Sequence, residues 1–284
     1  MRILLTGANG QLGRCIQDRV PKGCEIYAAS SAELDITNAD KVLSVVSEFK
    51  PNVIINAAAY TAVDKAESES DLAMLVNAVG PENLAIAAKE HRARLIHVST
   101  DYVFDGNSET PYLESDPTNP LGCYGKSKLD GELAVAKVLP DSIILRTAWV
   151  FSEYGNNFLK TMLRLGSERE TLGIVADQYG CPTYAGDIAI AIFQLINKNS
   201  EGGIYHYCGD RSVSWHQFAE EIFHQAVSLN KLPGSPSLNP LSTNEYPTQA
   251  LRPAYSILST SKAVMQGIQP SKWKVAVGYV IDKL

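Results

Sequence analysis

Short apolar runs dominated by Val, Ile and Ala alternate with longer helix-like segments through the first half of the chain. The runs predict strands at Arg2–Thr6, Glu25–Ala29, Asn52–Ala58, Arg94–Ser99 and Ser142–Val150. The segments between them predict helices at Gln11–Arg19, Ala39–Phe49, Asp71–His91 and Tyr124–Val138. This alternation favours right-handed βαβ crossovers. We therefore expect an α/β protein with a Rossmann-type, doubly wound parallel sheet that is buried on both faces.

The alternation loosens after Phe151. Further elements are predicted as helices at Asn157–Leu165 and Trp215–Val227, and as strands at 172–176 and 203–207 that join the same sheet. Pro, Ser and Asn are frequent between Lys231 and Pro253, which is typical of a loop. We interpret residues 1–150 as the main domain and residues 151–284 as a smaller, interleaved C-terminal lobe.

The composition is that of an ordinary globular protein, with 45% hydrophobic and 20% charged residues. The formal charge of −6 leaves no broad basic face, so we expect neither nucleic acid nor a membrane as a partner. The longest apolar stretches, such as Ile188–Ile196, are far shorter than the ~20 residues of a membrane span. There is no signal-peptide pattern, and the five cysteines are scattered without a C-x-x-C pair. These features indicate a cytoplasmic protein without a metal site.

Three glycines, Gly7, Gly10 and Gly13, lie three residues apart between the first predicted strand and the first predicted helix. In such a turn one glycine permits the tight bend, one lets a pyrophosphate approach the backbone, and one allows close helix–strand packing. The helix N-terminus adds free N–H groups and partial positive charge. The pattern predicts a dinucleotide site, and a plain strand–helix turn is the alternative.

The residues after the second predicted strand, Ala28–Ser31, bear on which dinucleotide binds. A carboxylate at this point favours NAD, and a basic group accommodates the extra phosphate of NADP. The stretch has no carboxylate, and Ser30 or Ser31 could donate to a phosphate, although no Arg is present. We expect NADPH as the cofactor, with NADH possible.

Tyr124 and Lys128 are four residues apart at the start of a predicted helix, and therefore share one helix face. An ammonium group lowers the pKa of a nearby tyrosine, which makes the phenol a usable proton donor to a carbonyl. Thr100, at the end of the fourth predicted strand, could hydrogen-bond the same carbonyl oxygen. A second pair with this spacing, Tyr279 and Lys283, lacks such a hydroxyl, so we regard it as accidental.

These residues together resemble the extended short-chain dehydrogenase/reductases that act on nucleotide sugars. Longer matches resemble one family among them, the dTDP-4-dehydrorhamnose reductases. These matches are Asn56–Glu67, Ser99–Phe104, Arg146–Val150, Gly155–Phe158, Ala176–Gly180, Tyr246–Thr248 and Arg252–Pro253. The resemblance extends over nearly the whole chain.

The resemblance implies a role for each matching residue. Tyr124 is the proton donor, Lys128 binds the nicotinamide ribose, and Thr100 supplies the hydroxyl. Cofactor contacts are implied for Gly7, Gly10, Gln11, Leu12, Gly13, Ser30, Asp35, Ile36, Ala58, Ala59, Tyr60, Thr61, Val98, Tyr124 and Lys128. Contacts with the dTDP-sugar are implied for Thr100, Asp101, Tyr102, Tyr124, Trp149 and Asn157.

The sequence departs from the family at one point. Some members form a dimer around a magnesium ion held by glutamates, and two of those positions are Cys15 and Gly186 here. Neither residue is a good magnesium ligand, so we carry over neither the metal nor that dimer. In this superfamily a helix such as the one predicted at Asp71–His91 often pairs subunits, and a homodimer is possible.

The implied reaction is NADPH-dependent reduction of the C4 keto group of dTDP-4-dehydro-L-rhamnose to dTDP-L-rhamnose, for a surface polysaccharide. One alternative is a reductase of another dTDP-linked keto-deoxysugar. A second is a non-catalytic NADP-binding regulatory subunit, like the beta subunit of methionine adenosyltransferase. The complete set of Thr100, Tyr124 and Lys128 argues against the regulatory alternative.

Overall fold

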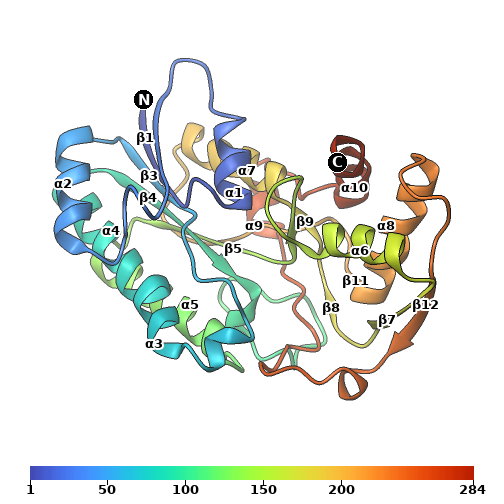
Figure 1. Ribbon diagram of the computed structural model, residues 1–284. Coiled ribbons are helices and arrows are strands. Elements are labelled where there is room, and N and C mark those ends of the chain that lie inside the picture. The colour runs from blue at the N-terminus through green and yellow to red at the C-terminus, as the bar shows by residue number, and fades with distance from the viewer.

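A parallel sheet of six strands forms the centre of the computed structural model, which describes residues 1–284 (Figure 1). The strand order is β10-β5-β4-β3-β1-β2. The strands are β1 (Arg2–Thr6), β2 (Glu25–Ala29), β3 (Val53–Asn56), β4 (Arg94–Thr100), β5 (Ile143–Thr147) and β10 (Gly203–His206). The order reverses between β1 and β3, where ligands bind in open sheets of this type. The predicted doubly wound α/β fold is confirmed.

Helices cover both faces of the sheet, because successive side chains of each strand point to opposite sides. On one face, Ile3 and Leu5 pack with α1 (Gln11–Gln17) and α7 (Ala185–Asn197). On the other face, Leu4 packs under a separate layer of helices. That layer contains α2 (Ala39–Phe49), α3 (Ser70–Met74), α4 (Gly80–Glu90) and α5 (Cys123–Val138). Helix α7 was not predicted, since it is apolar over most of its surface and only a narrow stripe, with Asp187, Gln194 and Asn197, is polar.

The helix predicted at Asp71–His91 is interrupted. Between α3 and α4, residues Leu75–Val79 form a π-helical turn that directs Asn77 inward. The Asn77 side chain accepts the N–H of Tyr60 at 2.9 Å and donates to the Tyr60 carbonyl at 3.0 Å. The π turn therefore fixes the loop that follows β3.

A second lobe packs beside the sheet (Figure 1). Its helices are α6 (Phe158–Glu168), α8 (Trp215–Ser228) and α10 (Trp273–Lys283), and its core includes Phe218 and Trp273. The strand predicted at 172–176 is present as β7 (Thr171–Val175), but its expected place in the main sheet is wrong. It pairs with β12 (Ser237–Leu241), which lies inside the segment predicted as a loop. Pro240 is tolerated in β12 because this strand is at the edge of a two-stranded sheet. The strand predicted at 203–207, by contrast, does join the main sheet as β10.

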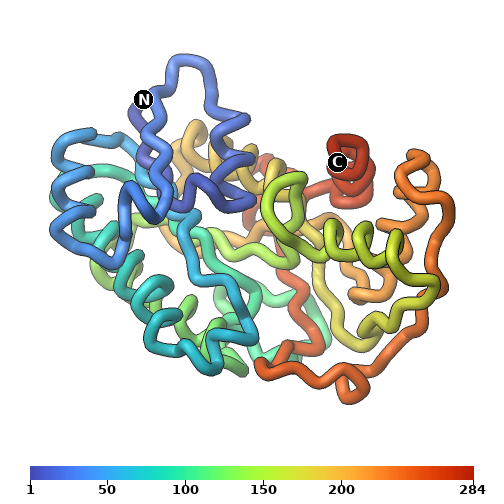
Figure 2. The backbone as a smooth tube through the Cα atoms, viewed as in Figure 1, coloured from blue at the N-terminus to red at the C-terminus, as the bar shows by residue number.

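The remaining elements are short and link the two parts. They are β6 (Val150–Phe151), β8 (Tyr179–Gly180), β9 (Thr183–Tyr184), β11 (Val213–Ser214), η1 (Lys65–Glu67), η3 (Asp101–Val103), η4 (Thr243–Glu245) and α9 (Ser261–Met265). After β12 the chain runs back from the lobe to the sheet, as the orange-red tube in Figure 2 shows. On the way, the Arg252 guanidinium binds Asp64 at 2.7 and 3.0 Å, and Ile257 accepts the N–H of Tyr112. The structure contains no candidate membrane-spanning helix.

Candidate functional site

The carboxyl ends of five strands open into one cavity of about 830 Å³ between the sheet and the lobe. Gly7 enters it after β1, Ser30 after β2, Ala58 after β3, Thr100 at the end of β4 and Trp149 after β5. The cavity is lined by every site residue predicted from the sequence except Gly13 and Tyr60. The fold thus brings together predicted site residues that are far apart along the chain.

The glycine turn after β1 has the geometry that its spacing predicts. Gly7 has φ +73°, and a Cβ there would lie 2.6 Å from the backbone of Ala57. A Cβ on Gly13 would lie 2.2 Å from the carbonyl oxygen of Gly7, so Gly13 acts in packing and stays outside the cavity. Gly10 precedes α1 without a side-chain cap, which leaves helix N–H groups free for an anion.

The end of β2 differs from the expectation that no carboxylate lies there. Glu33 folds back so that its Oε2 accepts the N–H of Ser30 at 2.8 Å and the Ser30 hydroxyl at 2.7 Å. These hydrogen bonds lower the pKa of Glu33, which keeps it ionised. The Ser-x-x-Glu spacing, typical of reciprocal capping, was the signal that could have revealed this contact.

Tyr60 lies next to the cavity but points away from it. Its hydroxyl donates to Glu69 at 2.6 Å, and only its backbone is held by Asn77. The neighbouring residues Ala58, Ala59 and Thr61 do line the cavity. The N–H of Ala58 donates to the buried Asn56 side chain at 3.1 Å, which fixes the start of this loop.

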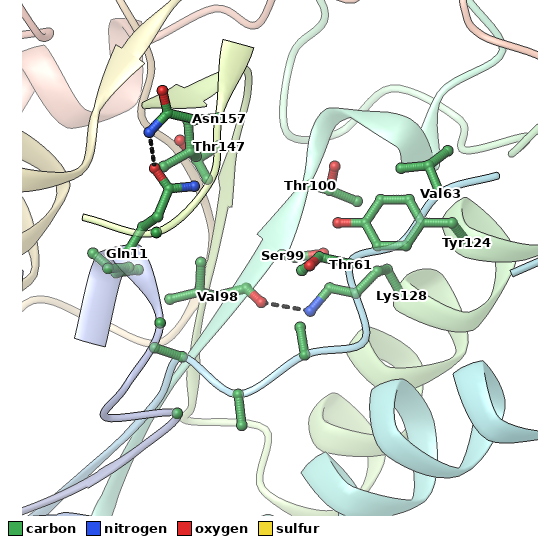
Figure 3. Close-up of a pocket in the computed structure, with 18 of the residues that line it drawn as sticks. Gln11, Thr61, Val63, Val98, Ser99, Thr100, Tyr124, Lys128, Thr147 and Asn157 are labelled. Atoms are coloured by element: carbon green, nitrogen blue, oxygen red, sulfur yellow. Dashed lines mark hydrogen bonds between the residues drawn. The ribbon is translucent and has the colours of Figure 1, made fainter. Parts of the chain in front are cut away.

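Thr100, Tyr124 and Lys128 lie close together at the cavity floor (Figure 3). Lys128 is almost fully buried, and its Nζ donates to the Val98 carbonyl at 2.7 Å. The Thr100 hydroxyl lies beside the phenol of Tyr124 and donates to Oδ1 of Asp101 at 3.0 Å. The predicted trio therefore forms a cluster with Asp101 directly behind it.

The expected effect of Lys128 on Tyr124 is wrong for this structure. The Lys128 ammonium points to Val98, and burial raises the pKa of Tyr124 to about 12. The Thr100 hydroxyl lowers that pKa and Asp101 raises it further. Burial also raises the pKa of Asp101, to about 6. Tyr124 consequently carries its proton at neutral pH, as a proton donor must.

An aromatic wall closes the lobe side of the cavity. The strand predicted at Ser142–Val150 breaks at Trp149, whose φ of +46° turns its ring toward the lobe. The Trp149 ring stacks on Trp215 with centroids 3.5 Å apart and an interplanar angle of 5°. The ring centroids of Phe158 and Trp215 are 4.7 Å apart. Trp215 was not predicted as a site residue, because only the fold brings the start of α8 to the cavity.

Asn157 connects the glycine turn to the lobe (Figure 3). Its Nδ2 donates to Oε1 of Gln11 and to the Ser152 carbonyl, both at 2.8 Å. Its Oδ1 accepts the N–H of Lys160 and so caps α6. Since both ends of this amide are engaged within the protein, Asn157 lines the cavity as a linking residue.

Comparison with known proteins identifies the family. A sequence profile described as the RmlD substrate binding domain matches residues 1–284. A dTDP-4-dehydrorhamnose reductase of Aggregatibacter actinomycetemcomitans is 51% identical over 284 aligned residues, which cover 97% of this chain and 97% of the relative. This chain belongs to the dTDP-4-dehydrorhamnose reductase family.

Two solved structures of family members are closely similar to this one. A dTDP-4-dehydrorhamnose reductase from Clostridium acetobutylicum has a TM-score of 0.94 at 42% identity, with 100% of this chain and 99% of that chain covered. The enzyme from Bacillus anthracis, solved in complex with NADP, has a TM-score of 0.94 at 40% identity and the same coverage. The family fold thus extends over the whole chain.

The magnesium site that some family members use does not fit the residues of this chain. Cys15 is a buried thiol whose pKa burial raises to about 12, and Gly186 has no side chain. Arg19 fills the space instead, because a Cβ on Gly186 would lie 2.5 Å from its Nη2 atom. That guanidinium donates to the Tyr184 hydroxyl at 2.9 Å. A fixed cation therefore lies where the divalent ion would need carboxylates.

Magnesium removal is accordingly expected to leave the protein unchanged. Dialysis against EDTA should not shift the thermal unfolding midpoint, and adding MgCl₂ back should not raise it, because a ligand stabilises only the fold that binds it. Differential scanning fluorimetry measures both. A midpoint that rises with MgCl₂, but not with an equal ionic strength of NaCl, would contradict the assignment.

Proposed function

We propose that this protein reduces the C4 keto group of dTDP-4-dehydro-L-rhamnose to dTDP-L-rhamnose with NADPH. The observation that carries the proposal is the placement of Thr100, Tyr124 and Lys128 on the cavity that also contains the glycine turn. The family membership supports the same reaction. The product would serve as an activated deoxysugar for a surface polysaccharide.

The chain offers a continuous path for the dinucleotide along the strand ends. The turn at Gly7 and Gly10 would hold the pyrophosphate, with Gln11 and Leu12 beside it. Asp35 and Ile36 would contact the adenine, and Ala58, Ala59, Thr61 and Val98 would border the central and nicotinamide portions. The NADP complex of the Bacillus anthracis relative supports this cofactor. When bound, the reduced nicotinamide supplies the hydride.

The protein's part in the reaction is to orient the carbonyl and to deliver a proton. With substrate bound, the Thr100 hydroxyl would turn from Asp101 Oδ1 and donate its hydrogen bond to the C4 oxygen while negative charge develops there. The Tyr124 O–H bond then breaks as its proton passes to that oxygen and completes the alcohol. Lys128 would bind the nicotinamide ribose from its buried position.

The lobe formed largely by residues 151–284 would bind the dTDP-sugar. Trp149 and Trp215 present flat aromatic surface to the cavity, suited to a sugar ring or a pyrimidine base. Tyr102 and Asp101 border the same space near Tyr124. We also propose that the protein is cytoplasmic and forms a homodimer. Exposed Leu72, Leu75 and Leu133 on the segment from α3 to α5 support the dimer.

Tyr124→Phe is expected to lower turnover by about 10²- to 10⁴-fold, because the proton donor is lost while the ring remains. NADPH affinity should stay near the wild-type value. The consumption of NADPH with dTDP-4-dehydro-L-rhamnose measures the first effect, and calorimetric titration measures the second. Tyr279→Phe is the matched control, since Tyr279 and Lys283 repeat the spacing away from the cavity.

Full turnover in Tyr124→Phe would contradict the assignment of Tyr124 as the proton donor. If the wild-type protein binds NADPH but oxidises it only with a different dTDP-keto-sugar, that sugar is the substrate. Binding without turnover on any keto-sugar nucleotide would support a regulatory subunit instead.

Glu33→Gln is expected to raise the preference for NADPH over NADH. The Glu33 carboxylate occupies both donors of Ser30 that an adenosine phosphate would use, and its charge repels that phosphate. The ratio of kcat/KM for NADPH to that for NADH should rise roughly fivefold. Glu48→Gln, an exposed change on α2, should leave the ratio unchanged. An unaltered ratio in Glu33→Gln would show that Glu33 does not influence cofactor choice.

A further inference from the structure

Helix α5 carries a third functional position below Tyr124 and Lys128. Glu132 follows Lys128 by four residues, as Lys128 follows Tyr124, so all three share one helix face. Lys128 and Glu132 are each only 2% exposed. A carboxylate at such depth needs a specific partner, because an unpaired buried charge is very costly.

That partner is Arg146 on β5, which is also 2% exposed. Its Nη2 donates to Glu132 Oε2 at 2.7 Å, and its Nε donates to both carboxylate oxygens at 3.0 and 3.2 Å. In the sheet Arg146 pairs with Ser99, directly before Thr100. The ion pair thus joins the helix of Tyr124 and Lys128 to the strands that carry the hydroxyl.

A phenyl ring and two buried histidines surround the ion pair and Lys128. Arg146 lies over the Phe104 ring and 3.4 Å from His206, whose pKa burial and Arg146 lower to about 3. On β4, His97 faces Lys128, and burial lowers its pKa well below the ordinary value. Both histidines are therefore neutral, and Glu132, which Arg146 holds at 2.7 Å, is the carboxylate one helical turn from Lys128.

Stability alone does not explain such a pair. Two charges lose their hydration on burial, and replacing a buried pair with apolar residues of similar volume is often neutral or stabilising. Here Glu132 lies one helical turn from the buried Lys128, and Arg146 pairs across the sheet with Ser99, the residue before Thr100. Its position points to the geometry and charge of the catalytic cluster.

We propose that the Glu132–Arg146 ion pair positions the catalytic helix, and that the Glu132 carboxylate acts on the Lys128 ammonium one helical turn away. This inference deepens the proposed function and rests on the role given there to Lys128. Glu132 touches neither the cavity nor the reacting atoms, so it acts through Lys128.

The proposal fixes the direction of a pH effect. Burial lowers the pKa of Lys128 from 10.5 to about 8, and Glu132 opposes this by raising it. An ammonium is lost as the pH rises through its pKa, so activity should fall on the alkaline side. Removing Glu132 should move that fall to lower pH.

The decisive experiment titrates Lys128 in the ligand-free protein by NMR, with lysine labelled with ¹³C at Cε and the signal assigned through Lys128→Arg. In Glu132→Gln the titration midpoint should fall by about one pH unit, a tenfold change in proton affinity. The alkaline limb of kcat/KM should shift with it. Asp130→Asn removes the same charge from the same helix outside the ion pair and should leave the midpoint unchanged.

Glu132→Gln leaves the buried Arg146 guanidinium without its partner, and this variant could misfold. A second variant therefore serves as a control. Glu132→Leu/Arg146→Met replaces both charges with apolar groups and should unfold at a denaturant concentration near that of the wild type. Its Lys128 midpoint should nevertheless lie below the wild-type value, with turnover reduced.

A wild-type midpoint in both variants, or wild-type turnover in the double variant, would overturn the proposal and leave the pair a packing element. The titration needs no substrate. A wild-type protein without reductase activity would therefore remove the proposed function, while the midpoints would still decide whether Glu132 controls Lys128.

Discussion

The hydrogen bond from the Lys128 ammonium to the Val98 carbonyl joins helix α5 to the central strand β4, and the site depends on this contact. Val98 is two residues before Thr100, and Lys128 is one helical turn after Tyr124. The distance between helix and strand therefore sets the positions of the ammonium, phenol and hydroxyl together. Two glycines let α5 approach the neighbouring segments η3 and Leu75–Val79 closely. A Cβ on Gly125 would lie 2.2 Å from the Tyr102 carbonyl oxygen, and one on Gly131 would lie 2.0 Å from that of Asn77.

Helix α5 and the second lobe are each fixed to the sheet side by contacts of their own. The first N–H of α5, on Cys123, donates to Glu67, and the middle of α5 is held by the Glu132–Arg146 pair. The lobe is held separately, through the Asn157 amide on Gln11 and the Arg252 guanidinium on Asp64. A proton donor fixed on the sheet side thus faces an aromatic wall that belongs largely to the lobe. Reduction of a bound keto-sugar needs both surfaces at a set separation.

Local sequence patterns were enough for the parts of the site that lie on single turns. The glycine spacing after β1 and the spacing of Tyr124 and Lys128 depend only on neighbouring residues and on helix geometry. The contacts that were missed join distant segments. Trp215 reaches Trp149 only after α8 packs on the lobe core, and β7 pairs with a strand that contains proline. The Glu33 carboxylate on Ser30 is local, but it depends on the backbone reversing after β2. The direction of the Lys128 ammonium, and with it the pKa of Tyr124, also required the folded structure.

The central claim is that hydride passes from the nicotinamide to C4 of the sugar while Tyr124 delivers the proton. The most direct measurement uses NADPH carrying deuterium at the transferred nicotinamide position, with dTDP-4-dehydro-L-rhamnose in ordinary water. Proton NMR and mass spectrometry of the product locate the isotope. One deuterium is expected, on C4 of dTDP-L-rhamnose. Oxidation of the cofactor without deuterium at C4 would contradict it.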